Sequence, residues 1–490
     1  MLTTAFIIEC SFLFAFQYFE SYITIMSNTH PRKHAQNQEG VIYAPWERRF
    51  IKVLTPFEEF VNGQTTSGLL LMASAVIALI LANTFFYETY AHILHMDVGL
   101  NIGDWKLEMT LHHWVNDALM ALFFFLVGME LKREILVGEL SDLRKATLPI
   151  VAAIGGMVVP ALIFFLLNSD GDASRGWGIP MATDIAFAVG ALVLLGNKVP
   201  KALVTFLVAL AIVDDLGAVL VIALFYTKEI MPLWLGAAGL IFAVLVFFNI
   251  VGVRKTLPYF LVAVLLWYAV LQSGVHATIA GVLGAFSVPA RPKYDASLFV
   301  ERLRELVDRF KAGLDSGKNI LTNSQLQDVA QSLETDVNNV QTPLQNLEHH
   351  WHIPVAFFVI PVFALFNAGV PLQFDSWSAV LTNPIVLGVS LGLIIGKFIG
   401  IVGASWIFIK LGLSQLPTGV KFSQLAGVAI LAGIGFTMSI FVAELAYASS
   451  HIDYLVMAKV GILSASLIAG VIGYFWLWTV AKSNQKRLEP

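Results

Sequence analysis

Charge and cysteine are scarce in this chain. Only 13% of its 490 residues are charged, whereas a soluble domain carries about 25%. Hydrophobic residues make up 57% of the chain, and the mean hydropathy is +0.75. The single cysteine, Cys10, excludes an internal disulfide. The net charge of −4 gives no indication of a nucleic-acid partner. The composition is that of a polytopic membrane protein.

The sequence predicts neither a signal peptide nor a metal cluster. Residues 2–26 are apolar and aromatic, but they lack the basic start of a signal peptide and carry two glutamates. We interpret them as part of an N-terminal extension, with an additional membrane segment as the alternative. No metal cluster is indicated. The histidines at 112–113 and 349–352 lie near predicted helix ends or in a polar loop, where surface histidines are expected.

Long apolar runs dominate the rest of the chain. A run of about 20 apolar residues crosses a bilayer as a helix. The runs predict an all-α polytopic membrane protein with twelve transmembrane helices. The expected spans are 66–86, 114–131, 146–167, 178–196, 202–226, 232–252, 257–271, 274–289, 353–370, 384–409, 423–446 and 456–480.

The basic residues fix the expected orientation of these spans. Of the 30 lysines and arginines, 25 fall in one alternating set of polar segments and three in the other. By the positive-inside rule, the richer set and both termini are cytoplasmic. The expected parts are an N-terminal extension and tail, spans one to eight, an enlarged cytoplasmic loop, spans nine to twelve, and a short tail. Their bounds are 1–55, 56–289, 290–352, 353–480 and 481–490.

Two polar connections carry patterns of their own. Residues 96–107 alternate apolar and polar around Gly103-Asp104, which suggests a short external β-hairpin, with an ordinary loop as the alternative. Within 290–352, apolar residues at helical spacing predict two amphipathic helices around 316–324, and Pro343 should interrupt any continuation. A plain linker is an equally good interpretation of that segment.

Two adjacent carboxylates, Asp214 and Asp215, lie near the middle of the apolar run 202–227. A charged side chain at the centre of a bilayer costs roughly 2.5–3.5 kcal/mol on insertion scales, and neighbouring carboxylates also repel each other. The pair needs a compensating proton or cation. We therefore predict a site for a cation, protons or both.

Two spans have sequences that should break a membrane helix. Pro180 and nearby glycines surround Asp184 in the fourth span, and three glycines cluster near Thr437 in the eleventh. Interrupted segments at corresponding places in two halves indicate a transporter site. The three-span blocks 146–226 and 384–480 start on opposite sides, as inverted-topology repeats require.

Lys397 lies near the centre of the tenth span and is the natural partner of a nearby aspartate. With Asp184 and the central pair, the site holds a surplus of negative charge that protons or a small cation can relieve. A fixed, fully satisfied salt-bridge network is the structural alternative. It is disfavoured because adjacent aspartates project about 100° apart on a helix and cannot face one lysine equally.

Other ionisable residues flank the spans. Glu130 and Glu134 follow the second span and, with Asp117, can line an acidic entrance, although an ordinary charged helix end has the same composition. His276 can titrate near neutral pH, although a single histidine at a membrane edge is more often structural.

Six short sequences, in order, cover most of residues 60–480. They are LVGMELKRE, ATDIAFAVGAL, ALAIVDDLGAV, SGVHATIAG, IGKFIGI and LAGIGFTMSIF. In this combination the chain closely resembles the NhaA family of bacterial sodium/proton antiporters, a named example of the inverted-repeat transporter fold. The resemblance implies twelve spans, with the broken fourth and eleventh helices crossing near mid-membrane.

The resemblance also implies roles for the central residues. Asp214 and Asp215 would bind Na⁺ or Li⁺ transiently and exchange it for protons, with Asp215 as the more direct ligand. Asp214 would pair with Lys397 when no sodium is bound. Asp184 and Thr183 would balance charge and helix dipoles at the crossing.

Glu130, Glu134, His276 and Glu348 match positions linked to the family's pH response. Two features depart from the family pattern, namely the N-terminal extension before about residue 55 and the enlarged 290–352 segment, which contains Glu348. The external hairpin would support a homodimer in the bacterial inner membrane, surrounded by lipid.

The expected activity is expulsion of Na⁺ in exchange for protons, which serves pH and sodium homeostasis. Protons and sodium would compete for the carboxylates, so activity should rise from neutral to alkaline pH. Two titrating groups per sodium would make exchange electrogenic. We expect no enzymatic reaction and no cofactor besides the transported ions. A sodium-coupled solute symporter is the main alternative, and an intramembrane aspartyl protease is disfavoured because Lys397 would disturb a shared-proton dyad.

Overall fold

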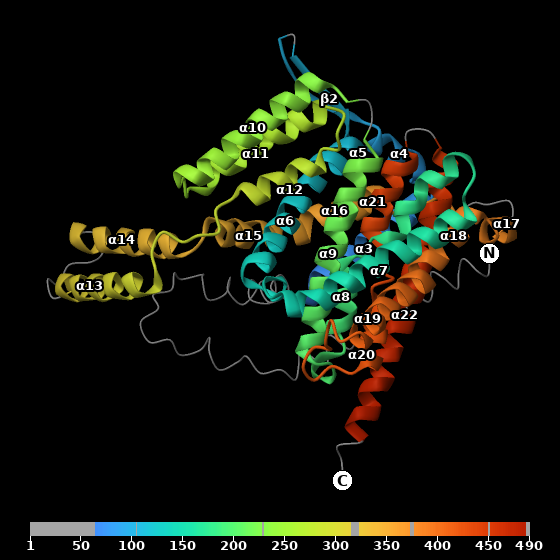
Figure 1. The fold of residues 1–490 in the computed structure, drawn as a ribbon. Helices are drawn as coiled ribbons and strands as arrows, with labels where there is room; N and C mark the ends of the chain where they lie inside the picture. The colour runs from blue at the N-terminus through green and yellow to red at the C-terminus, as the bar shows by residue number, and fades with distance from the viewer. Residues whose placement is uncertain are drawn as a thin grey trace. The chain divides into compact units, whose positions relative to one another are not determined.

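The structure is a computed structural model that describes residues 64–103, 105–227, 230–314, 323–372, 377–448 and 451–486. The predicted N-terminal extension, most of the link at 316–324 and the end of the C-terminal tail lie outside these ranges. The described part is mostly helical (Figure 1). This confirms an all-α protein with apolar membrane-length helices.

Within the described ranges, eight helical segments are long and apolar enough to cross a membrane. Some of them contain a π-helical or 3₁₀ turn. They are α5–η1–α6 (Leu111–His113, Trp114–Leu119, Met120–Val137), α7 (Leu143–Leu167), η3 with α8 (Gly171–Met181, Ile185–Val193), α9 (Lys201–Phe225), α10 (Pro232–Val251), α15–η6–α16 (Pro343–Pro354, Val355–Val359, Ile360–Asn367), α18–η7–α19 (Pro384–Leu391, Gly392–Gly396, Lys397–Lys410) and α22 (Ile452–Lys486).

Four more candidates are bent or short. Helices α3 (Gln64–Ala82) and α4 (Tyr87–Leu94) meet at 115°. Helices α20 (Phe422–Leu431) and α21 (Phe436–Tyr447) meet at 46°, so the predicted eleventh span is indeed interrupted. The shorter apolar helices are α11 (Thr256–Gln272) and α12 (Thr278–Ser287). Three short helical elements, η2 (Glu139–Ser141), η4 (Gly196–Lys198) and α17 (Trp377–Leu381), lie in the connections.

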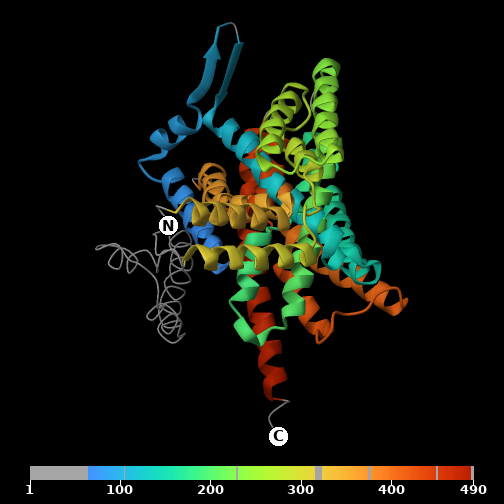
Figure 2. The same cartoon turned by 90° about the vertical axis from the view of Figure 1, so that its left-hand side faces the viewer.

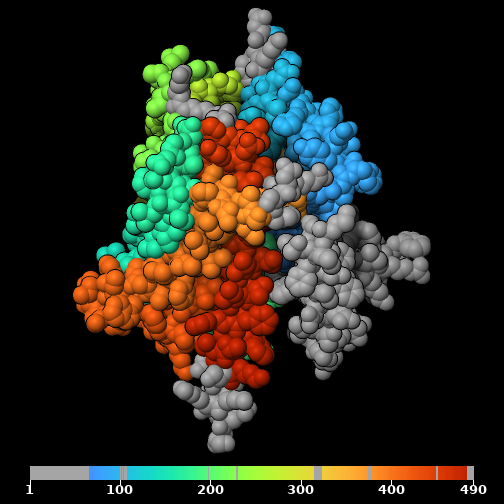
Figure 3. All heavy atoms as spheres, turned by 90° about the vertical axis from the view of Figure 1, so that its right-hand side faces the viewer, coloured from blue at the N-terminus to red at the C-terminus, as the bar shows by residue number. Residues whose placement is uncertain are grey.

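The helices α7 and α19 pack closely because both present glycines at their contact. A Cβ added at Gly155 would lie 2.3 Å from the carbonyl oxygen of Gly400, and one added at Gly400 would lie 2.1 Å from that of Gly155. Small residues let membrane helices approach in this way. On the face shown in Figure 3, the orange and red segments from α18 to α22 lie beside the teal segment that contains α7. This contact fixes the helix that carries Lys397.

The connection between α4 and the next span forms the predicted β-hairpin. Strands β1 (Asp97–Ile102) and β2 (Trp105–Thr110) pair antiparallel, with Asp97 opposite Thr110 and Ile102 opposite Trp105. Trp114 Nε1 donates to the carbonyl oxygen of Val98 at 2.8 Å, which ties the hairpin to the following helix. The hairpin projects at the end opposite the C-terminal end of α22 (Figures 1 and 2).

The two predicted amphipathic helices are present as α13 (Ala296–Leu314) and α14 (Ser324–Val340). They lie side by side (Figure 2) and bury Leu306 and Leu326. Arg302 Nε donates to Asp336 Oδ2 at 2.9 Å. Pro343 interrupts the chain as expected, but it also begins α15, because proline suits the first turn of a helix. The ninth span therefore starts at Pro343 rather than at residue 353, and Glu348 lies on it.

We predict that Gly400→Ala destabilises the protein, because the added methyl group must displace the backbone of α7. Overpacking of this kind costs about 1–3 kcal/mol. Gly403→Ala on the same helix is the matched control, since a Cβ there meets no atom within 4 Å. Thermal unfolding in detergent measures both variants. Equal midpoints for the two would contradict the close contact.

Candidate functional site

The breaks in two helices meet and satisfy each other's backbone. The first break, residues 182–184, separates η3 from α8, and the second, residues 432–435, separates α20 from α21. The Asp184 N–H donates to Ile434 O at 2.7 Å, and Ser439 Oγ donates to Ile179 O at 2.8 Å. Unwound backbone in a membrane protein is tolerated only where such partners exist. The two interruptions predicted from sequence are therefore one structural unit.

The Asp184 carboxylate caps two helices at once. Its Oδ1 accepts the N–H of Phe187 at 3.0 Å, in the first turn of α8. Its Oδ2 accepts the N–H of Thr437 at 3.1 Å and the Thr437 hydroxyl at 2.5 Å, in the first turn of α21. Helix N-termini carry partial positive charge, so one buried anion stabilises both. Asp184 is consequently fully engaged.

Asp214 and Lys397 form a buried ion pair with Thr183. The Lys397 ammonium contacts Asp214 Oδ2 and donates to Thr183 Oγ1 at 2.8 Å. The Thr183 hydroxyl lies 2.6 Å from Asp214 Oδ2 and 3.0 Å from the carbonyl oxygen of Ala432. None of the three side chains is more than 1% exposed. The pairing of Asp214 with Lys397, expected from the resemblance, is the arrangement in the structure.

Asp215 differs from its neighbour. It is fully buried, and neither of its carboxylate oxygens has a hydrogen-bond partner among the described residues; the same is true of Asp214 Oδ1. Buried carboxylate oxygens without partners are costly. The charged groups that act on Asp215 include Asp214, Asp184, Lys397 and Glu130, and three of these four are acidic. Carboxylate oxygens of this kind are chemically able to accept a proton or a hard cation.

A local change of helix geometry places Lys397. The π-helical turn η7 (Gly392–Gly396) ends directly before it, and such turns are frequent at functional sites. Across from it, Gly156 on α7 leaves space for Ile401, one turn after the lysine, since a Cβ there would lie 2.9 Å from Ile401 Cγ1. The extra residue in the turn shifts the face on which α19 presents its side chains.

The acidic group after the second span lies on α6 and contacts α15. Arg133 pairs with Glu348 and lies 3.5 Å from Glu134 Oε1. Glu134 Oε2 also accepts the N–H of Glu139 at 3.1 Å. Glu130 is within electrostatic reach of both Glu348 and Asp215. The four candidates for a pH response therefore include three that lie together, namely Glu130, Glu134 and Glu348.

The fourth candidate, His276, and the entrance residue Asp117 lie elsewhere. Asp117 Oδ1 is 3.7 Å from His276 Nε2. On the continuous helix from Leu111 to Val137, Asp117 is 13 residues before Glu130, a rise of roughly 20 Å. The expectation that Asp117 and Glu130 share an acidic entrance is therefore wrong. Helical rise separates them, and Asp117 belongs to the end near the β-hairpin.

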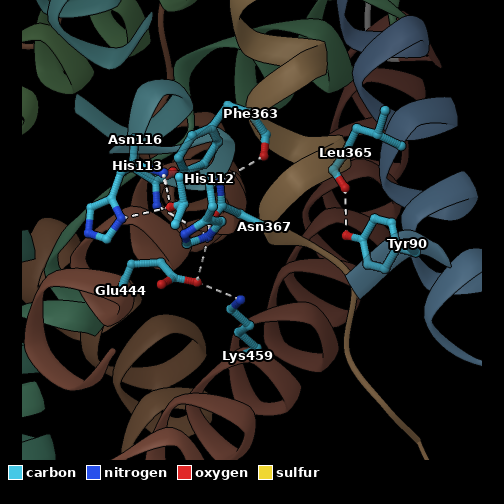
Figure 4. Close-up of polar contacts among 10 residues, drawn as sticks. Tyr90, His112, His113, Asn116, Phe363, Leu365, Asn367, Glu444 and Lys459 are labelled. Atoms are coloured by element: carbon cyan, nitrogen blue, oxygen red, sulfur yellow. Dashed lines mark hydrogen bonds and ion pairs between the residues drawn. The ribbon is translucent and has the colours of Figure 1, made fainter. Parts of the chain in front are cut away.

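A further polar network, which sequence reasoning missed, lies at that same end (Figure 4). Glu444 on α21 accepts from Lys459 on α22 at 2.6 Å. His112, expected to be a surface histidine, lies with Asn116 and Asn367 beside this pair. Charged and amide side chains within apolar runs were visible in the sequence, but nothing there indicated that they meet. No group of three metal-ligating residues occurs among the described side chains.

These features define a class of protein. Apolar helices of membrane length surround two mutually satisfied breaks, beside which a buried lysine engages only part of a carboxylate pair. Interrupted membrane helices with ionisable groups at the break are characteristic of secondary transporters. The chain is a multi-pass membrane protein of that kind.

Comparisons with known proteins identify the family. The family model "Na+/H+ antiporter 1" matches residues 58–477. Na⁺/H⁺ antiporter NhaA 1 of Saccharophagus degradans is 55% identical, over 92% of this chain and 97% of that protein. Na⁺/H⁺ antiporter NhaA of Sulfurimonas denitrificans is 51% identical over 90% and 99%, and that of Dichelobacter nodosus is 48% identical over 90% and 95%. The chain belongs to the NhaA family of Na⁺/H⁺ antiporters.

We predict that Lys397→Met lowers thermal stability, because it leaves Asp214 buried without its cation. Breaking a buried ion pair costs about 3–5 kcal/mol. The double variant Lys397→Met/Asp214→Asn should recover most of this loss. Lys410→Met, which removes a lysine over the Trp406 ring at the end of the same helix, is the control. The thermal unfolding midpoints of the variants are measured at alkaline pH. A double variant with the same midpoint as Lys397→Met would contradict the ion pair between Lys397 and Asp214.

Proposed function

We propose that this protein is a sodium/proton antiporter that expels Na⁺, and also Li⁺, in exchange for protons. The observation that carries the proposal is the set of three buried carboxylate oxygens without partners, two on Asp215 and one on Asp214. Carboxylate oxygens bind hard cations and protons alike. The names of the relatives support the same activity.

The proposed mechanism is competition at Asp215. When protons are abundant the buried carboxylates hold them, because desolvation and mutual repulsion both favour the neutral form. At neutral to alkaline pH the protons leave and Na⁺ takes their place on Asp215 and the free oxygen of Asp214. Lys397 either releases a proton or loosens from Asp214 as sodium arrives, and it returns when sodium leaves. Thr183 keeps the lysine oriented, and Asp184 keeps the two helix ends in place.

The net charge moved across the membrane for each sodium depends on how many groups of the site titrate. If two groups titrate for each sodium bound, two protons cross in exchange for one Na⁺, so transport is electrogenic and the membrane potential drives it. Rocking of the two repeats would expose the site to each side in turn. The protein would thereby contribute to pH and sodium homeostasis, without an enzymatic reaction or a resident cofactor.

The proposed topology has twelve spans, with the broken fourth and eleventh helices crossing near mid-membrane. The eight long helices, the two bent pairs and the two shorter apolar helices together supply that number. The hydrogen bonds between the two breaks support the crossing. The distribution of basic residues supports cytoplasmic termini and an external β-hairpin. The proposed membrane is a bacterial inner membrane.

The pH response is proposed to arise at Glu130, Glu134 and Glu348. Because Arg133 pairs with Glu348 and also approaches Glu134, a change of protonation in either acid alters the balance at the other. Glu130 transmits that change to Asp215 through its charge. His276 acts at the opposite end through Asp117.

A sodium-coupled solute symporter is the second reading of the fold. It requires a cavity for an organic solute beside the carboxylate pair. On α9 the residues beside the pair are apolar, with Ala211, Ile212 and Ala218 buried and Val213 partly buried, so they offer an organic solute no polar contact. The named antiporter relatives also disfavour the symporter.

Asp215→Asn is expected to abolish exchange, because the amide binds neither a proton nor Na⁺ in the required way. Fluorescence dequenching in everted vesicles measures it, with NaCl, LiCl and KCl added at neutral and alkaline pH. The unmodified protein should respond to sodium and lithium, more strongly as pH rises, and should generate a current on a vesicle-coated electrode.

Asp172→Asn is the control, because that aspartate pairs with His451 away from the site. Dequenching that survives in Asp215→Asn at unmodified strength would overturn the assignment of the ion site. Dequenching without a current would leave the exchange intact but refute the two-proton stoichiometry.

The β-hairpin is proposed to support a homodimer. Strands β1 and β2 form a two-stranded sheet with open edges, and a sheet edge readily pairs with another strand. Replacing residues 97–110 with a short glycine-serine linker should convert the dimer to a monomer without loss of exchange. Light scattering of the detergent-purified protein gives the mass. An unchanged dimer mass would exclude the hairpin as the contact.

A further inference from the structure

The polar network around Glu444 lies on the same helix as the ion site. Thr437, which binds Asp184, and Glu444 are two turns apart on α21, about 10 Å along its axis. Positions 437, 441 and 444 follow the helical spacing of one face. Glu444 therefore lies in line with the ion site, toward the end that carries the β-hairpin.

Phe441 occupies the position between them. Its ring lies 5.7 Å from that of Phe124, 6.1 Å from that of Phe363 and 5.5 Å from that of His276. Phe124, Phe363 and Phe441 are at most 1% exposed. This group of three rings, the aromatic barrier, separates Glu444 from Asp184 along α21 in the conformation seen here.

The polar network is partly exposed to solvent at His112 and buried at Glu444. The His112 side chain is 21% exposed, whereas the Glu444 side chain is 4% exposed. His112 Nε2 lies 3.8 Å from Glu444 Oε1. A partly exposed imidazole, a group that can both take up and release a proton, thus connects solvent at the hairpin end with a carboxylate inside the protein. Figure 4 shows both side chains turned toward each other.

Two asparagines provide partners for both tautomers of this imidazole. Asn367 Nδ2 donates to Asn116 Oδ1 at 2.8 Å and to Phe363 O at 3.0 Å. Its Oδ1, 2.9 Å from His112 Nε2, therefore accepts a hydrogen carried by Nε2. Asn116 Nδ2, 3.3 Å from the same nitrogen, can donate to it once that hydrogen has left. The site is thus built for an imidazole that gives up the Nε2 hydrogen.

We propose that His112 and Glu444 form a proton relay between the outer solution and the ion site, on the outer side of the aromatic barrier. The proposal rests on the antiport function and the outward orientation of the hairpin proposed above. Hydronium is the ligand: protons arriving from outside bind here before they reach Asp214 and Asp215. Lys459 keeps Glu444 ionised between turnovers, so that it can accept them.

The transfer is balanced without any further reactant. A hydronium ion gives its proton to Nδ1 of His112 and leaves as water. The resulting imidazolium gives its Nε2 hydrogen to Glu444 Oε1 through one water across the 3.8 Å gap, and Glu444 becomes neutral. His112 then carries its hydrogen on Nδ1, with Asn116 donating to Nε2, until exchange of the ring hydrogens with water restores the Nε2–H tautomer. Glu444 then loses the proton inward when the barrier opens, and it returns to its pair with Lys459.

Other charged or titratable groups face this relay from each neighbouring element. They are His113 on α5, Tyr90 on α4, Lys459 on α22, and Asp117 with His276 near η1 and α12. In Figure 4 the His113 ring points away from Glu444, and its Nδ1 lies 2.8 Å from Thr110 Oγ1. His113 is therefore a matched control on the adjacent residue.

The test uses right-side-out vesicles that are loaded with sodium, in which the medium contacts the outer face. Sodium efflux is recorded as the pH of the medium is lowered. His112→Gln and Glu444→Gln should each slow proton-driven efflux by about tenfold or more, as expected for the loss of a proton-transfer group, and should flatten its dependence on medium pH. Glu444→Asp should retain that dependence, and His113→Gln should follow the unmodified protein.

Everted vesicles supply the second readout. There the apparent affinity for sodium at the cytoplasmic face should be unchanged in His112→Gln, because the ion site itself is intact. Asp215→Asn in the same preparations tests the antiport function separately. The relay is overturned if His112→Gln has the pH profile of the unmodified protein while Glu444→Gln lowers efflux equally at every pH and lowers the unfolding midpoint. Glu444 would then only hold α21 to α22.

Discussion

A membrane interior offers no water to backbone groups, and this constraint shapes the centre of the molecule. Two helical segments are interrupted, and hydrogen bonds between them satisfy polar groups at the breaks: the Asp184 N–H donates to Ile434 O, and Ser439 Oγ donates to Ile179 O. The Asp184 carboxylate supplements this exchange by capping α8 and α21 together. Because the two breaks satisfy each other's backbone in this way, the adjacent α9 can remain a regular helix and carry two carboxylates into the same region.

The centre also divides its charges unequally. Lys397 and Thr183 engage one oxygen of Asp214, and the remaining three oxygens of the aspartate pair have no described partner. A fully satisfied network would be inert, because every ligand exchange would have to break several buried bonds. The unequal division leaves binding capacity while the lysine limits the net charge. The glycine contact between α7 and α19 contributes to this arrangement, because it holds α19, and with it Lys397, close to α7.

Sequence alone predicted the charged centre, because Asp214, Asp215 and Lys397 are exceptional in apolar runs, whatever their neighbours. Pro180 and the glycines near Thr437 likewise predicted the breaks. Which side chains meet depends on helix rotation and packing, so neither Thr437 as a partner of Asp184 nor the network of His112 and Glu444 could be derived. Asp117 was grouped with Glu130 wrongly, because residues that are 13 positions apart in sequence lie roughly 20 Å apart along one helix.

The double cap at Asp184 has a consequence for how the protein changes shape. One carboxylate holds the starts of α8 and α21, so a movement that pulls these two helices apart must release both caps in the same event. Contacts that break together favour two well-separated conformations over a continuum between them. A partly opened intermediate would expose two uncapped helix ends at once. The shared carboxylate thus disfavours partly opened conformations, through which ions would leak.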